Sequence, residues 1–191
     1  MTTANAKTSM RDRLVEAASA LFYTTGLRAV SVDKVIERAG TTKVTFYRHF
    51  KAKDDLVAAY LQASAQRERE GVEAAFAAAG GDVRVALARL GELIGASACR
   101  PGFRGCAFIN AAAEYPDADS APRRVVDAHR AWYRSAFQDL VAPLGVPDPT
   151  AVAEDLLLLR DGAMVAGYLD DPAGLAASFA RSSSAVVSAA R

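Results

Sequence analysis

The sequence predicts an all-α protein of about nine helices, and three observations lead to this fold class. Alanine, the strongest helix former, supplies 42 of the 191 residues, whereas isoleucine and threonine are scarce. Apolar residues recur every three or four positions through most of the chain, which is the spacing of amphipathic helices. Capping residues, prolines and glycines divide these apolar stripes into segments of helical length.

Four helices are expected in the first part of the chain. They span about residues 10–25, 32–39 and 42–49, followed by a long helix from residue 53, and their caps are Ser9, Ser31 and Thr41 or Thr42. Gly26 and Gly40 end the first two helices, because glycine readily adopts the left-handed conformation that follows a helix. Phe46 and Phe50, four residues apart, mark the buried side of the third.

Five further helices are expected after Gly80 and Gly81. The first is capped by Asp82, the second spans about 105–115, and the third is capped by Ser120. The fourth and fifth span about 149–169 and 172–190, and each opens with Asp-Pro. The helix over 105–115 is apolar on every side except at Asn110 and Glu114, so we expect it to be buried.

Several classes of protein are excluded by what the sequence lacks. The longest uncharged apolar stretches are too short to span a bilayer, and residues 1–10 lack the apolar core of a secretory signal, so we expect a soluble cytoplasmic protein with no membrane partner. Phosphate-binding loops, nucleophile elbows and metal motifs do not appear, so we expect a non-enzyme with no catalytic residues, no metal and no cofactor. Cys99 and Cys106 are too few for a disulfide framework and leave a thiol-based redox sensor as a minor alternative.

Two short helices joined by a turn at Gly40 are typical of a helix-turn-helix, although such a turn also occurs in ordinary helical bundles. Because neighbours on a helix cannot both face the core, burial of Phe46 turns Tyr47 outward. Hydroxyls and amines on the outward face of the second helix would then meet phosphates and base edges. That face consists of Thr41, Thr42, Lys43, Thr45, Tyr47 and Arg48, with His49 and Lys53 flanking it.

The segment from residue 11 to residue 61 resembles the DNA-binding domain of the TetR family of bacterial transcriptional regulators. The resemblance rests on the 22–26 segment FYTTG, the Ala39-Gly40 turn, the triplet Thr45-Phe46-Tyr47, the pair His49-Phe50, and Lys53 before an acidic residue. It implies a DNA-binding domain over residues 1–55 and a ligand-binding and dimerisation domain over residues 56–191.

The resemblance also implies roles for individual side chains. Thr42, Lys43 and Thr45 would approach bases or nearby phosphates, and Ser31, Tyr47, His49 and Lys53 would bind phosphates. His49 has the alternative of being only a solvated surface residue. Thr41 stands where the family mostly has a buried valine, and Val44 stands where it mostly has a small residue. Val44 is a candidate contact for a thymine methyl group, so base preference cannot be copied from a relative.

The second half of the chain offers candidates for a small-molecule pocket. Asn110 and Glu114 share one side of their helix, and a ligand is one possible partner for buried polar groups. The full set of candidate ligand residues is Phe108, Asn110, Glu114, His129, Trp132, Tyr133, Met164 and Tyr168. Each also has a structural alternative, in which Asn110 caps a helix end, His129 is a core histidine and the aromatic residues only pack.

The last two helices carry the features of a dimer interface. The leucines at 156–159 cover more than one side of their helix, and small residues nearby permit close helix packing. The candidate interface residues are Leu157, Gly162, Ala166, Ala173, Ala177 and Ala180.

Together these features predict a homodimeric, TetR-like regulator, most simply a repressor, that binds a palindromic double-stranded DNA operator and is released by a small-molecule effector. The alternative is a dimeric DNA-binding protein without a ligand. The formal net charge of +1 does not argue against DNA binding. Residues 1–55 hold 10 Lys and Arg against 6 Asp and Glu, a surplus of 4, whereas the remainder has 13 against 16.

Overall fold

The computed structural model describes residues 9–190; residues 1–8, on which the expected absence of a secretory signal depends, and Arg191 lie outside the described part. Between residues 9 and 190 the chain forms nine α-helices, which confirms the predicted fold class. They are α1 (Met10–Thr25), α2 (Val32–Ala39), α3 (Lys43–His49), α4 (Lys53–Ala77), α5 (Val83–Ala98), α6 (Ala107–Glu114), α7 (Ala121–Val141), α8 (Pro149–Leu169) and α9 (Leu175–Ala189). None of these helices combines the length and apolar character needed to cross a bilayer.

Side-chain caps set most of the helix starts. Ser9 accepts a hydrogen bond from the Asp12 amide at 3.1 Å, and Ser120 and Asp148 cap α7 and α8 in the same manner. The last helix starts later than expected, because Pro172–Gly174 form a separate 3-10 turn capped by Asp171 before α9 begins.

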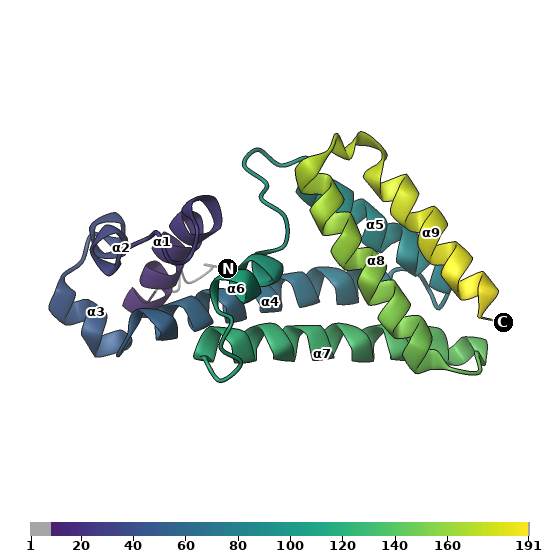
Figure 1. Ribbon diagram of the computed structural model, residues 1–191, viewed down its shortest axis with the longest axis horizontal. Helices are drawn as coiled ribbons and strands as arrows, with labels where there is room; N and C mark the ends of the chain where they lie inside the picture. The colour runs from purple at the N-terminus through teal and green to yellow at the C-terminus, as the bar shows by residue number, and fades with distance from the viewer. Residues whose placement is uncertain (1–8, 191) are drawn as a thin grey trace, which may run out of the picture.

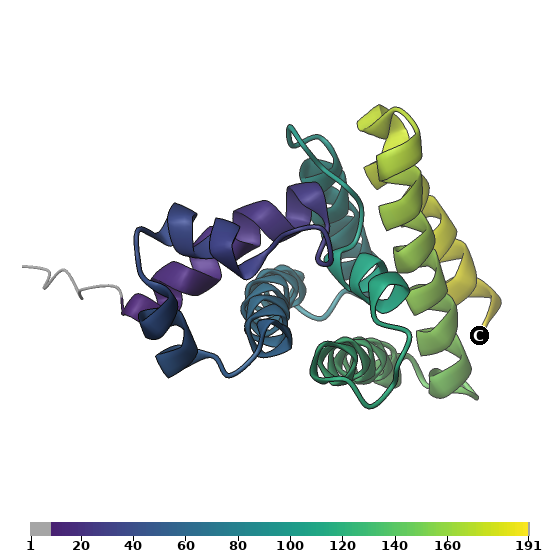
Figure 2. The same ribbon diagram turned by 60° about the vertical axis from the view of Figure 1, so that its left-hand side comes forward.

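The molecule is elongated (Figure 1). Helices α1–α3 form one end, α8 and α9 form the other with α5 beside them, and α4 and α7 run between the two ends. Seen from a second direction, in which α4 and α7 are viewed nearly end-on, the two helices still lie side by side (Figure 2). Helix α4 therefore connects the helix-turn-helix directly to the rest of the protein.

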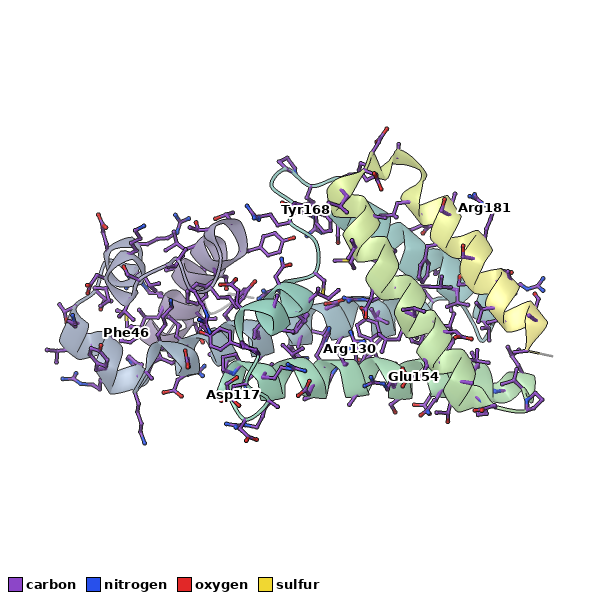
Figure 3. All side chains as sticks on the ribbon, in the orientation of Figure 1. Phe46, Asp117, Arg130, Glu154, Tyr168 and Arg181 are labelled. Carbon is purple, nitrogen blue, oxygen red and sulfur yellow. The ribbon has the colours of Figure 1, made fainter. Side chains whose placement is uncertain are left out.

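Two clusters of buried apolar side chains form the core. The first joins α1–α3 and the start of α4 to α6 and to Val126 of α7. The second joins the distal part of α4 to α5, α7, α8 and α9. Two ion pairs link α7 to α8, one part-buried, with Arg130 2.6 Å from Asp161, and one exposed, with Arg134 2.6 Å from Glu154 (Figure 3).

Helix α6 differs from its predicted form. It buries only Phe108 and Ala111, while Asn110 and Ala113 are exposed, so the expectation of a helix buried on all sides is wrong. Alanine-rich stretches carry little periodic information, because alanine is tolerated on either side of a helix.

Candidate functional site

The turn between α2 and α3 fixes the orientation of α3. Gly40 adopts a left-handed conformation, with φ of +61°, and the Thr41 amide donates back to the Ile36 carbonyl at 3.1 Å. Thr42 then caps α3 by accepting from the Thr45 amide at 3.2 Å. On the inner side of α3, Phe46 is fully buried and packs against Phe50. The opposite side of α3 is therefore held outward.

The outward side of α3 carries most of the predicted DNA contacts. Val44 and Tyr47 are exposed by 69% and 49%, so both side chains are accessible to a partner. Exposed side chains on or next to this helix are Ser31, Thr42, Lys43, Arg48 and His49, whereas Thr41, Thr45 and Lys53 are half-buried. The structure thus brings all ten predicted residues to one end of the molecule.

Three of these residues have additional roles within the chain. Ser31 caps α2 by accepting from the Lys34 amide, and its hydroxyl proton remains free to donate elsewhere. Lys43 forms an exposed ion pair with Asp33 at 3.5 Å, which contributes little to stability. The Lys53 ammonium donates to the Arg28 carbonyl, and partial burial lowers its pKa.

The predicted ligand residues fall in two separate places. Phe108, His129, Trp132 and Tyr133 form one aromatic cluster, in which the Phe108 and His129 rings stack with their centres 3.7 Å apart. Trp132 and Tyr133 contact each other edge to face at 4.8 Å. Met164 is half-buried and packs against both hydrophobic clusters.

A buried ion pair beneath this aromatic cluster was not predicted from the sequence. The Arg160 guanidinium, only 2% exposed, binds the Glu68 carboxylate and also lies 3.2 Å from Cys106 Sγ. Tyr133 donates its hydroxyl to the same carboxylate at 2.7 Å, and His129 Nε2 lies 3.3 Å from its second oxygen. Arg160 could have been suspected, because it directly follows four leucines, but Glu68 lies within a run of charged residues and gives no such signal.

These neighbours determine the ionisation of Glu68. Burial alone would raise the pKa of the carboxyl group, because it disfavours the charged form. The adjacent His129 imidazole, the Arg160 guanidinium and the Tyr133 hydroxyl outweigh burial and lower the pKa of Glu68 to about 2. Glu68 is therefore ionised at neutral pH.

The other predicted ligand residues, Asn110, Glu114 and Tyr168, line a pocket of about 260 Å³ beside the end of α1. Figure 3 shows Tyr168 at the end of α8, next to the loop that leads into α6. Asn110 donates to the Arg104 carbonyl at 2.8 Å. It is exposed, so the premise that it is a buried polar group in need of a partner is wrong.

Helix α6 is hydrogen-bonded to the helix-turn-helix end of the molecule. The Glu114 carboxylate accepts from the amides of Leu27 and Arg28 at 2.9 and 2.7 Å, and the Arg28 side chain donates to the Glu114 carbonyl. The Tyr115 hydroxyl donates to Asp54 at 2.9 Å, and burial raises the pKa of this tyrosine. A movement of α6 would therefore directly displace the segment between α1 and α2, to which it is hydrogen-bonded.

The predicted interface residues lie on α8, on α9 and in the 3-10 turn between them, and they divide between core and surface. Leu157 is only 2% exposed and packs in the second cluster, so its prediction as an interface residue is wrong. Gly162, Ala173 and Ala177 are exposed, and Ala166 and Ala180 are half-buried. An apolar stripe that was not predicted lies on the outward side of α8, and it consists of Leu158, Val165 and Leu169, which are exposed by 71%, 45% and 70%.

The two cysteines lie in different environments. Cys99 is exposed, whereas Cys106 is buried next to Arg160, and both are free thiols. The pairing that a disulfide switch would need is therefore not formed in this structure.

An all-helical chain that holds the second helix of a helix-turn-helix outward has the architecture of a DNA-binding transcriptional regulator. Residues 14–60 match the family model described as bacterial regulatory proteins, tetR family. The crystal structure of a TetR-family transcriptional regulator from Streptomyces coelicolor is similar with 38% identity, 95% of each chain covered and a TM-score of 0.85. The chain therefore belongs to the TetR family, whose members are transcriptional regulators and not enzymes.

Two further proteins are similar to this chain. A TetR-type regulator from Streptomyces avermitilis shares 29% identity, with 95% of this chain and 98% of that chain covered and a TM-score of 0.82. The HTH-type transcriptional activator FasR of Mycolicibacterium smegmatis is 40% identical over 52 residues, which are 27% of this chain. The match spans only 24% of the length of that activator.

Proposed function

We propose that this protein is a homodimeric, ligand-responsive repressor that binds a palindromic operator in the cytoplasm. The observation that carries this proposal is the outward polar side of α3, which Phe46 and the Thr42 cap hold in a fixed orientation. Residues 1–55 would supply DNA binding, and residues 56–191 would supply ligand binding and dimerisation. A twofold dimer presents one α3 from each subunit to successive major-groove faces, which matches a palindromic site.

Ligand response requires that the effector bind one arrangement of the dimer more tightly than another. Helix α4 is suited to transmit the difference, because it starts next to α3 and ends in the second hydrophobic cluster. A coupling free energy of about 1–3 kcal/mol would weaken DNA binding roughly 5- to 150-fold. Activation in place of repression would use the same contacts, and the FasR relative is named an activator.

The proposal is tested with the DNA upstream of the protein's own gene. Fluorescence anisotropy should show saturable binding of that DNA at low salt, and a screen of small molecules should find one that releases it. Lack of binding would count against autoregulation, whereas binding that no ligand reverses would favour the ligand-independent alternative. Transcription from the same promoter in vitro separates repression from activation.

Replacing Leu158 with glutamate should abolish the proposed dimer. Leu158, Gly162, Val165 and Leu169 recur at helical spacing on the outward side of α8, and a charge there cannot be desolvated against a second copy. Size-exclusion chromatography with light scattering should report a monomer, and operator affinity should fall with it. Leu93→Glu on α5, which alters a leucine exposed by 39%, is the matched control and should remain dimeric. Full operator binding by a monomeric Leu158→Glu variant would contradict this interface.

A further inference from the structure

A groove of about 510 Å³ lies between α4 and α7, and it is distinct from the pocket beside α1. The two helices run side by side (Figures 1 and 2), and each contributes one stripe of residues to the groove wall. The residues from α4 are Ala58, Gln62, Ala65, Gln66 and Arg69, and those from α7 are Ala121, Arg124, Val125, Ala128 and His129. At 1.5 Å per residue these stripes are roughly 12–16 Å long, so the groove suits an elongated ligand.

The charged residues that line the groove are all positive. Arg69 and Arg124 are cationic, and the residues that line the groove include no aspartate or glutamate. The nearby Glu68 is not among them, and its oxygens are already engaged by Arg160, Tyr133 and His129. The groove therefore favours a negatively charged group.

Two buried polar atoms lack partners at one end of the groove. His129 is 2% exposed, and its Nδ1 makes no hydrogen bond to any residue in the described range 9–190. Arg69 Nε is also buried without an acceptor in that range, while the guanidinium lies over the Trp132 ring at 5.0 Å. Buried polar groups are nearly always hydrogen-bonded, so two such atoms on residues that line one groove point to a ligand that hydrogen-bonds to them.

The rest of the wall combines small apolar residues with the polar side chains of Gln62, Gln66 and Arg124. Small side chains, Ala58, Ala65, Ala121 and Ala128, leave the space open along the helices, and Val125 adds apolar surface. We infer that this groove binds an elongated organic anion, with its acidic group at the Arg69 guanidinium and its apolar chain along the alanines. A role for this anion as the releasing effector rests on the proposed function, but its binding does not.

Trp132 provides a direct test, because it is the only tryptophan in the chain and its ring contacts both Arg69 and His129. Titration of the full chain with sodium octanoate, below its micelle concentration, should change the Trp132 emission saturably. Octylammonium, which has the same chain length and the opposite charge, should not. Loss of a charge-assisted hydrogen bond in Arg69→Gln should weaken octanoate binding about tenfold or more, as measured by calorimetry.

Arg89→Gln is the matched control, because it removes one exposed arginine from α5, which does not line the groove. It should bind octanoate like the unaltered protein. Absence of saturable binding, equal binding of octylammonium, or unchanged affinity in Arg69→Gln would each overturn the inference. If octanoate binds through Arg69 but does not release operator DNA, the groove assignment stands and the proposed release by this ligand fails.

Discussion

Replacing Glu68 with glutamine is expected to lower the free energy of unfolding by about 3 kcal/mol. The substitution keeps the shape of the side chain but removes one of the two carboxylates that pair with the buried Arg160 guanidinium, leaving only Asp161 at 3.1 Å. Breaking a buried ion pair in this way costs roughly 3–5 kcal/mol. The lower value applies because the Glu68 side chain retains 29% exposure. Urea unfolding followed by circular dichroism measures the change. Glu73→Gln, an exposed carboxylate on the same helix, should unfold like the unaltered protein.

The same substitution has a defined pH dependence. The pKa of Glu68 is about 2 in the folded protein, below its ordinary value of 4.5, so its ionised form stabilises the fold. This contribution is fully present above about pH 4.5 and is lost as the pH falls towards 2. The stability difference between the unaltered protein and Glu68→Gln should therefore shrink across that range. A difference that stays constant down to pH 3 would contradict the assignment of the charge to Glu68.

Replacing Lys43 with alanine is expected to weaken operator binding about tenfold or more while leaving ligand affinity unchanged. Lys43 lies in the first turn of α3 and is exposed, with only a weak ion pair to Asp33. A lost phosphate contact should also reduce the salt dependence of binding by about one ion per subunit, and a lost base contact would relax sequence preference. Anisotropy at several salt concentrations gives both quantities.

The control for Lys43→Ala is a lysine-to-alanine change of equal charge on another helix of the same domain. Lys34→Ala on α2 removes an exposed amine that is not among the predicted contacts. It should lower affinity less than Lys43→Ala does. An unchanged footprint and affinity in the Lys43 variant would show that α3 does not read the operator through this end.

The helix ends were the part of the fold that could be predicted best from the sequence. The bounds of α1 follow from the Ser9 cap and Gly26, because capping is local chemistry that does not depend on distant contacts. Burial was harder to predict where a pattern has several solutions. In the run of leucines at 156–159, the side chain of Leu157 is buried and that of Leu158 is exposed, and only packing against other helices decides between them.

The surroundings of the candidate ligand residues also depend on packing that the sequence does not reveal. His129 and Glu114 both lie on helix faces that the sequence pattern identifies. In the structure, His129 lies next to Glu68 of α4, whereas Glu114 accepts hydrogen bonds from the backbone that follows α1. These partners are distant in sequence, and the charged run around Glu68 has no pattern that marks one of its members as buried. Tertiary contacts therefore set the chemistry of both places.

The first hydrophobic cluster has a consequence for how the chain folds. Leu14 and Phe22 share this core with Leu61 of α4 and Phe108 of α6, which lie well beyond residue 55. A fragment ending at residue 55 would lose these partners and expose apolar surface, so it would not form a cooperative folding unit by itself. The segment that meets DNA is thus smaller than the segment that must fold for it to do so.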